Sequence, residues 1–294
     1  MKKRKTIRNC LGFTLIELFV VISLLGVLIS LLLVGISQAR ETVRRVKCTN
    51  NLSQIGLGLQ NYESTYKVFP RAAGPKSGHS PLVSILPYVE QSVVYASINF
   101  NADVDGNGTA TKTRIDIYRC PSTRLQERPE RTDYTINRGT TLALPRNDPW
   151  YFDEKIFPRA NYFSKGLSGT ALFSETCPRI EGVQKGAMFE LRRRNVFIKE
   201  EAEQFELECE AATNGTGRGT IDNGHYWFGA GTANHFHIFT PNLRSCSNSG
   251  LTQDSLYTAT SMHTGGVNVL FADGRVEFIS DGVENEAWRT IGKR

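Results

Sequence analysis

An apolar run near the N-terminus constrains this chain more than any other feature. Residues 13–35 are apolar or small and polar, and Glu17 is the one charged residue among them. About twenty such residues suffice to cross a membrane as a helix, so the run predicts a transmembrane helix. Because an ionised carboxylate at membrane depth costs on the order of 2–3 kcal/mol, Glu17 predicts a function that offsets this cost.

The residues before the run indicate its orientation. Residues 1–12 contain five of the 35 basic residues of the chain and none of its 29 acidic residues. Basic clusters stay on the cytoplasmic side, and the run is too long for a cleaved signal peptide, so a retained single span with a cytoplasmic N-terminus is expected. Without the leader, 30 basic residues face 29 acidic residues, a net charge of +1. The overall charge of +6 therefore reflects topology, and nucleic acid is not an expected partner.

The segment that joins the leader to the run carries a resemblance. "GFTLIE", Gly12 to Glu17, resembles the class III signal of type IV prepilins and of the pseudopilins of type II secretion. The resemblance implies that a prepilin peptidase cuts between Gly12 and Phe13 and that Phe13 is then N-methylated. It also implies that the Glu17 carboxylate meets the N-terminal amine of a neighbouring subunit, where two opposite charges offset each other in a low dielectric. The alternative is an ordinary anchor in which Glu17 snorkels or is protonated.

A helical pattern continues beyond the apolar run. Residues on one helical face recur at alternating spacings of four and three: Cys48, Leu52, Ile55, Leu59, Tyr62 and Tyr66. This predicts one long helix from near Phe13 to about Tyr66, with its second half packed on a globular head. The predicted organisation is a basic leader at 1–12, a transmembrane half-helix at 13–35, an amphipathic half-helix at 36–66 and a head at 67–294.

The head is predicted to be an α+β domain with an antiparallel sheet. Together with the long N-terminal helix, the resemblance to prepilins implies a pilin-like fold. Residues 80–98 predict a short helix interrupted at Pro87, and residues 183–219, with a basic and then an acidic cluster, predict a solvated excursion. The stretch "MHTGGVNVLFADGRVEFIS" predicts a hairpin with Asp273 and Gly274 as its loop. With a two-residue loop, Val267, Val269 and Phe271 are expected to share a core face with Val276 and Phe278.

The same stretch resembles a second family. His263 is followed after nine residues by Asp273 and Gly274, and this H-x9-DG motif closes a large pilin-like family of unknown function that is abundant in planctomycete genomes. "VKCTNNLSQIGLGLQNY", "YRCPS" and "GLSGTALFSE" occur in that family's order, and the resemblance covers nearly the whole chain. The chain departs from the family at Val34, where proline is common, which puts a kink of the membrane helix in doubt.

The cysteines suit an exported head. Cys10 lies in the leader, and five others remain: Cys48, Cys120, Cys177, Cys209 and Cys246. Outside the cytoplasm they allow one or two disulfides with at least one thiol left over, and spacing does not give the connectivity. The family resemblance implies a Cys48–Cys120 disulfide, because both residues lie in stretches shared with the family.

Two metal sites can be imagined but are not favoured. The histidines that fall within forty residues are His225, His235, His237 and His263, and none of their spacings is diagnostic of zinc or copper. Residues 101–108 are similar to the start of a calcium loop, but Lys112 stands where the closing glutamate belongs, so a polar turn is favoured. No cofactor or metal is therefore predicted.

The expected function is structural. The chain has no nucleophile elbow, phosphate-binding glycine loop or H-E-x-x-H motif, so an enzyme is not expected. The resemblances imply a pilin-like or pseudopilin-like subunit that is anchored in the cytoplasmic membrane, with its head in the periplasm or on the cell surface. Its expected partners are the prepilin peptidase, other pilin or pseudopilin subunits and the membrane. The alternative is a membrane-anchored binding module whose head recognises polysaccharide, metal or protein.

Overall fold

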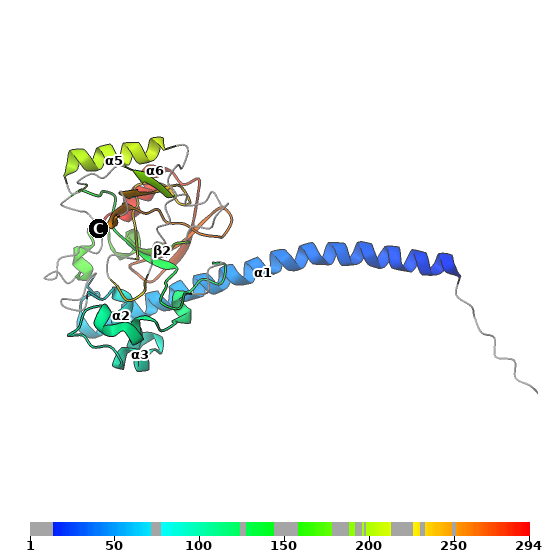
Figure 1. The fold of residues 1–294 in the computed structure, drawn as a ribbon, viewed down its shortest axis with the longest axis horizontal. Coiled ribbons are helices and arrows are strands. Elements are labelled where there is room, and N and C mark those ends of the chain that lie inside the picture. Colours follow the sequence, from blue (N-terminus) through cyan, green and yellow to red (C-terminus); the bar gives the residue numbers. More distant parts are fainter. Residues whose placement is uncertain are drawn as a thin grey trace, which may run out of the picture. The chain divides into compact units, whose positions relative to one another are not determined.

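The computed structural model describes residues 14–71, 78–123, 128–143, 158–177, 188–191, 196, 198–212, 226–229, 233–248 and 251–294. The chain divides into two compact units, Met1–Val43 and Arg44–Arg294. The long helix α1, Leu15–Tyr66, begins in the first unit and ends in the second (Figure 1).

The first part of α1 begins with a capping box. The Glu17 amide donates to Thr14 Oγ1 at 3.3 Å, and the Thr14 amide donates to the Glu17 carboxylate at 2.9 Å. These reciprocal bonds satisfy amides that the first helical turn would otherwise leave without partners. The large apolar side chains that the structure describes between Leu15 and Ile36 are exposed, and the helix is long and apolar enough to cross a membrane.

The second part of α1 is the amphipathic face of a packed helix. Cys48, Leu52, Ile55 and Leu59 are fully buried, whereas Tyr66, at the end of the helix, is exposed. The apolar stripe is fully buried up to Leu59, Tyr62 packs partly buried against the same cluster, and the stripe ends at the exposed Tyr66.

The other helical elements of the described chain are shorter than α1. The α-helices after α1 are α2 Pro81–Ser84, α3 Ser92–Ala96, α4 Gly108–Thr111, α5 Lys199–Ala211 and α6 Asn285–Gly292. The 3₁₀ turns are η1 Leu86–Val89, η2 Asp105–Asn107, η3 Asp116–Tyr118, η4 Ala160–Tyr162 and η5 Leu167–Gly169. The helix expected over residues 80–98 is interrupted, as predicted, but into three pieces: α2, η1, which contains Pro87, and α3. Glu90 adopts a left-handed conformation between the last two.

The main sheet of the head has five strands in the order β4-β1-β2-β7-β8. The bounds are β1 Tyr134–Asn137, β2 Ala171–Glu175, β4 Asn234–His235, β7 Gly266–Phe271 and β8 Val276–Ser280. Only the β1–β4 pair is parallel, so the sheet is rich in antiparallel pairs and the head is an α+β domain.

Strand β7 is buried on both of its faces. Leu270 belongs to the core cluster that contains the inner face of α1, and Val267, Val269 and Phe271 belong to the cluster around Trp288 of α6. Because successive side chains of a strand point to opposite faces, α1 and α6 cover opposite sides of this strand.

The β7–β8 hairpin forms, but its register differs from the prediction. Val269 pairs with Glu277 and Leu270 with Val276, so Val267 and Val269 share a face with Ile279 and Glu277 instead of Val276 and Phe278. The loop holds one residue more than the two-residue turn, since Phe271 N donates to Arg275 O, and Gly274 has a φ of +89°. This is the three-residue loop with a left-handed glycine, and a shift of one residue exchanges the faces.

A second, three-stranded sheet takes its strand β3 from the predicted solvated excursion, which also contains α5. Its order is β3-β5-β6, with β3 Met188–Leu191, β5 Ser245–Asn248 and β6 Leu251–Leu256. Helix α5 packs Ala202, Phe205 and Cys209 into one buried cluster with Cys246 of β5 and Leu256 of β6. Cys209 forms a disulfide with Cys246. The prediction of a solvated excursion was wrong for α5, because its many charged residues obscure in the sequence a short apolar face that is buried in the structure.

Candidate functional site

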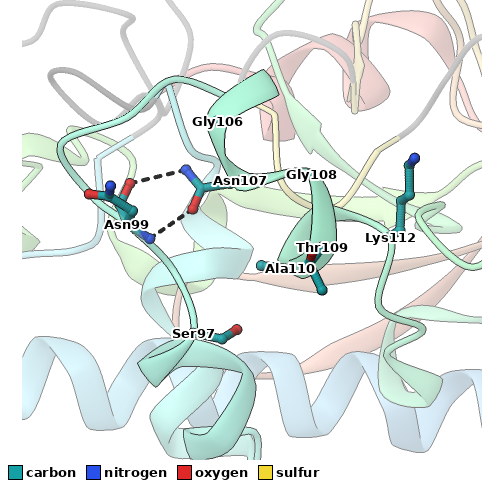
Figure 2. Close-up of a pocket in the computed structure, with 8 residues that line it drawn as sticks. All are labelled: Ser97, Asn99, Gly106, Asn107, Gly108, Thr109, Ala110 and Lys112. Carbon is teal, nitrogen blue, oxygen red and sulfur yellow. Dashed lines mark hydrogen bonds between the residues drawn. The ribbon is translucent and has the colours of Figure 1, made fainter.

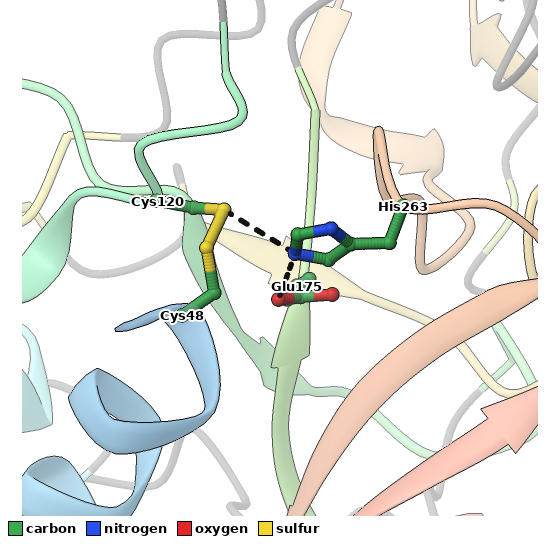
Figure 3. A group of neighbouring side chains, drawn as sticks. All are labelled: Cys48, Cys120, Glu175 and His263. Carbon is green, nitrogen blue, oxygen red and sulfur yellow. Dashed lines mark hydrogen bonds and ion pairs between the residues drawn. A yellow bond between two sulfur atoms is a disulfide. The ribbon is translucent and has the colours of Figure 1, made fainter. Parts of the chain in front are cut away.

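A buried disulfide lies where α1 meets the head. Cys48 is on the inner face of α1, and Cys120 follows the short turn η3. Their sulfurs are bonded, and their Cα atoms are 5.0 Å apart (Figure 3). The structure thus pairs the two cysteines that the family resemblance implied.

Two ionisable side chains lie against this disulfide. His263 Nε2 is 3.7 Å from Cys120 Sγ and 3.5 Å from Glu175 Oε1, and Figure 3 shows the imidazole pointing at both. Glu175 ends strand β2, and His263 lies in the loop before β7. All four residues are buried, with exposed fractions of 0–4%. We call Cys48, Cys120, Glu175 and His263 the disulfide–histidine cluster.

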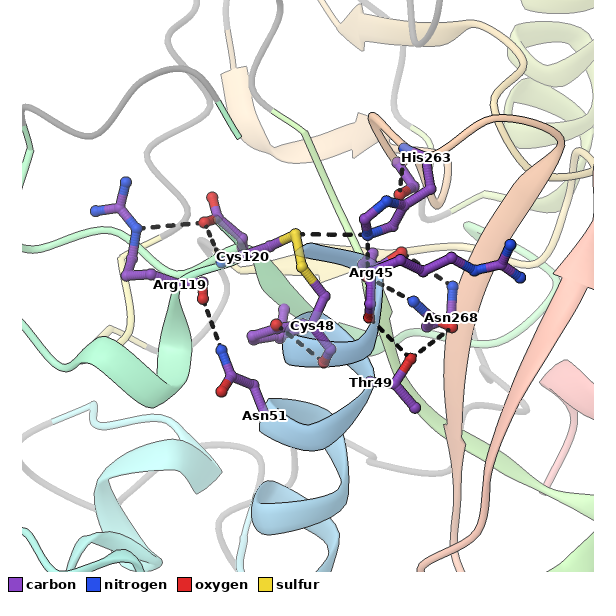
Figure 4. Close-up of a disulfide and its surroundings, with 12 residues drawn as sticks. Arg45, Cys48, Thr49, Asn51, Arg119, Cys120, His263 and Asn268 are labelled. Carbon is purple, nitrogen blue, oxygen red and sulfur yellow. Dashed lines mark hydrogen bonds and ion pairs between the residues drawn. A yellow bond between two sulfur atoms is a disulfide. The ribbon is translucent and has the colours of Figure 1, made fainter. Parts of the chain in front are cut away.

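Strand β7 and helix α1 hold the glutamate in place. Asn268 of β7 donates to Glu175 twice, from its backbone amide to Oε2 at 3.0 Å and from Nδ2 to Oε1 at 2.9 Å. Thr49 of α1 donates to Asn268 Oδ1 at 3.3 Å (Figure 4). A buried carboxylate needs such donors, and these orient Oε1 toward His263.

A charged pair positions the Cys120 side of the cluster. Asp133 Oδ2 accepts a 2.8 Å hydrogen bond from the Cys120 amide and lies 3.3 Å from Arg119 Nε. Burial raises the pKa of Asp133 to about 6, although the Arg119 guanidinium acts in the opposite direction. Asn51 of α1 donates to the Arg119 carbonyl at 2.7 Å. Helix α1 is therefore joined to this segment by that hydrogen bond and by the Cys48–Cys120 disulfide. These bonds restrain the backbone around the disulfide.

The H-x9-DG motif has its two ends at opposite ends of β7. His263 reaches the disulfide–histidine cluster, whereas Asp273 and Gly274 form the hairpin turn. Asp273 Oδ1 accepts from the Arg275 amide at 3.0 Å, which stabilises that turn. The two halves of the motif therefore have different roles: His263 belongs to the disulfide–histidine cluster, and Asp273 and Gly274 form the turn that sets the register of β7 and β8.

The remaining predicted site residues lie at the N-terminus. Gly12 and Phe13 are outside the described residues, so the structure says nothing of the processing site. Glu17 caps α1 through Thr14, a local role that sequence reasoning missed although "TLIE" matches the capping-box pattern.

The imagined histidine site is divided. His225 lies outside the described residues. His235 Nε2 and His237 Nε2 are 3.2 Å apart, and His237 stacks on Trp288 with ring centroids 3.8 Å apart. Burial lowers the pKa of His237 to about 3. Within the described part of the chain, no group of three metal-ligating side chains includes this pair, and His263 belongs to the other cluster.

The imagined calcium loop is a polar turn. Asn107 holds it together: its Oδ1 accepts from the Asn99 amide at 2.7 Å, and its Nδ2 donates to the carbonyls of Asn99 and Asp103. Figure 2 shows the open pocket of about 560 Å³ beside this turn, which is lined by Ser97, Asn99, Gly106, Asn107, Gly108, Thr109, Ala110 and Lys112. The side-chain amide of Asn107 thus forms hydrogen bonds to backbone groups of the turn itself.

Sequence reasoning missed Glu175 and Asn268 as members of a site. Glu175 ends the family-like stretch "GLSGTALFSE", and Asn268 is the polar residue inside an apolar strand. A carboxylate at the end of a largely apolar segment and an amide within a buried strand were the available signs. Neither indicates by itself which partner it meets.

The comparisons with known proteins give a family without an assigned function. The family model described as "Protein of unknown function (DUF1559)" matches residues 37–162 and 157–286. The matched ranges contain all four residues of the disulfide–histidine cluster. No curated protein and no solved structure matches the chain.

Proposed function

The chain belongs to the family of proteins of unknown function (DUF1559), and we propose that it is a pilin-like or pseudopilin-like structural subunit. In this proposal a prepilin peptidase removes residues 1–12, Phe13 is methylated, and α1 anchors the subunit in the cytoplasmic membrane. The head lies in the periplasm or on the cell surface, and the processed subunits assemble through their helices.

The observation that carries the proposal is the uncovered apolar half of α1. Large apolar side chains from Leu15 to Ile36 are exposed, on a helix that continues into the core of the head. A membrane or neighbouring helices of the same kind can cover such a surface, and both environments occur in the life of a pilin-like subunit. A plain membrane anchor needs only the membrane around this helix, and it gives Glu17 no partner. Substitution of Glu17 therefore distinguishes a plain anchor from an assembling subunit.

Glu17 has two candidate roles that predict different mutants. As a cap it acts with Thr14, and as an assembly residue it needs a cationic amine from a neighbouring subunit. A carboxylate in a low dielectric is stabilised by such a partner and destabilises an isolated span. Thr14→Ala weakens the cap and keeps the carboxylate, whereas Glu17→Gln keeps a polar group and removes the charge.

The test compares these variants with wild type in membrane fractions and in filaments sheared from cells. We expect Glu17→Ala and Glu17→Gln to insert normally and to lose most sheared filaments, while Thr14→Ala assembles. N-terminal sequencing of the same samples should find methylated Phe13. Equal filament yield from Glu17→Gln and wild type, or an intact Met1 in peptidase-competent cells, contradicts the proposal.

A further inference from the structure

We propose that the disulfide–histidine cluster is a zinc site when its disulfide is reduced, with Cys48, Cys120, Glu175 and His263 as the four ligands. One ligand atom from each residue lies within 4.8 Å of all the others. The proposal concerns the head alone and is independent of filament assembly. The proposal gives His263 of the H-x9-DG motif a role as a metal ligand, whereas Asp273 and Gly274 form the hairpin turn.

The chemistry of the neighbours argues for a ligand. A disulfide is apolar and needs no ionisable group beside it, yet Glu175 and His263 are buried within 4 Å of each other next to Cys120. Burying such groups costs free energy unless they are paired or bind a metal. Glu175 is paired with Asn268 and with His263, and a dication is a further partner that stabilises a carboxylate and an imidazole together.

The distances match a tetrahedral centre. With Zn–S bonds of about 2.3 Å and Zn–N or Zn–O bonds of about 2.1 Å, neighbouring ligand atoms lie about 3.4–3.8 Å apart. Cys120 Sγ and His263 Nε2 are 3.7 Å apart, and His263 Nε2 and Glu175 Oε1 are 3.5 Å apart. After reduction, rotation about the Cα–Cβ bonds can separate the two sulfurs to such a distance.

The donor set favours zinc over the other common cations. Two thiolates exclude the hard ions calcium and magnesium, and a carboxylate with an imidazole completes a set that zinc accepts. Asn268 supplies an outer-shell contact, because its Nδ2 donates to the same Glu175 oxygen that faces His263. Such contacts orient the ligands of zinc sites.

The change between the two states is a two-electron step. A dithiol reductant attacks the disulfide, the Cys48–Cys120 bond breaks, two protein thiols form, and the dithiol closes to its own disulfide. Zinc then displaces the two thiol protons and binds both sulfurs as thiolates. Oxidation of the thiolates by a disulfide reagent reverses the step and releases the ion. Disulfide and zinc are therefore mutually exclusive.

The experiment uses the full chain in detergent micelles and cobalt(II) as a spectroscopic substitute for zinc. Every sample carries Cys10→Ser and Cys177→Ser, is reduced with a dithiol, and is freed of the dithiol under argon. We expect one cobalt per reduced chain, with thiolate charge-transfer bands, displacement by zinc, and no such bands for the oxidised chain. His263→Gln and Glu175→Gln should each weaken binding at least tenfold.

Two controls keep the outcome decisive. Cys209→Ser with Cys246→Ser removes the other cysteine pair and should retain the cobalt bands. The oxidised His263→Gln and Glu175→Gln chains, whose disulfide remains, report by circular dichroism whether they fold. In the chain that keeps all four other cysteines, zinc should slow alkylation of Cys48 and Cys120 at least tenfold, but not that of Cys209 and Cys246. Unchanged alkylation of Cys48 and Cys120, or equal cobalt affinity in His263→Gln and its parent, overturns the proposal.

Discussion

Asp133 is the residue at which burial and charge oppose each other most clearly. Its carboxyl bonds the Cys120 amide and the Arg119 guanidinium, and its side chain is almost completely buried. Burial raises its pKa from 3.8 to about 6. The folded chain therefore binds a proton at this residue over a pH range in which the unfolded chain has lost it.

The pH dependence follows from this difference. Because the folded-state pKa is the higher one, the stabilisation from Asp133 is fully present below about pH 4 and is lost as the pH rises through 6. The loss amounts to roughly 2–3 kcal/mol for a shift of this size. We expect the free energy of unfolding of wild type, minus that of Asp133→Asn, to fall by this amount between pH 4 and 7.

Denaturant titrations at several pH values measure this difference. Asp116→Asn replaces an exposed carboxyl in the same segment and is the control for the amide substitution itself. If the difference between wild type and Asp133→Asn rises with pH, the Arg119 contact outweighs burial and the argument fails.

Among the elements, α1 and the β7–β8 hairpin approach each other closely at Gly56. A Cβ on Gly56 would lie 2.7 Å from Leu270 Cδ1 and 3.2 Å from the Gly274 carbonyl oxygen. Gly56 weakens the helical pattern in the sequence because glycine is a poor helix former. In the structure it lets the helix lie directly on the hairpin turn.

Gly56→Ala tests this contact. Alanine gains about 1 kcal/mol of helix propensity, but the overpacking costs about 1–3 kcal/mol, because the turn backbone has to move. We expect a net loss of unfolding free energy, measured by the fluorescence of the buried Trp227 and Trp288 during denaturation. Gly26→Ala adds its methyl in open space and should leave that transition unchanged. A more stable Gly56→Ala would show that the contact is loose.

At the scale of the molecule, each disulfide belongs to a different core cluster. Cys48–Cys120 lies in the cluster between α1 and the main sheet, and Cys209–Cys246 lies in the cluster of α5 and the three-stranded sheet. The two bridges join residues 72 and 37 positions apart in the sequence. Closing loops of these lengths stabilises a fold by about 4 kcal/mol each in the chain-entropy description.

Peptide mapping under non-reducing conditions tests the pairing. We expect fragments that link Cys48 to Cys120 and Cys209 to Cys246, with Cys177 in neither bridge. Cys177→Ser should leave this pattern intact, because no bridge includes that residue. A peptide in which Cys177 is linked to one of the four cysteines of these bridges would contradict the arrangement.

The sequence alone determined the features that depend on neighbouring residues. The periodicity of Cys48, Leu52, Ile55 and Leu59 predicted the packed face of α1, and the Asp273–Gly274 pair predicted the hairpin. Helical faces and tight turns result from contacts within a few positions of the chain, so their pattern is legible without a structure. The Cys48–Cys120 pair was implied by a family resemblance and not by spacing.

Only the tertiary structure decided the register of the hairpin, the second sheet and the meeting of Glu175 with His263. One additional loop residue reversed the expected side-chain faces, and β3 pairs with a strand far along the chain. Glu175 and His263 meet because β2 pairs with β7, an event to which every residue of both strands contributes. Such pairings result from the summed burial of distant segments, and no short stretch of sequence carries that sum.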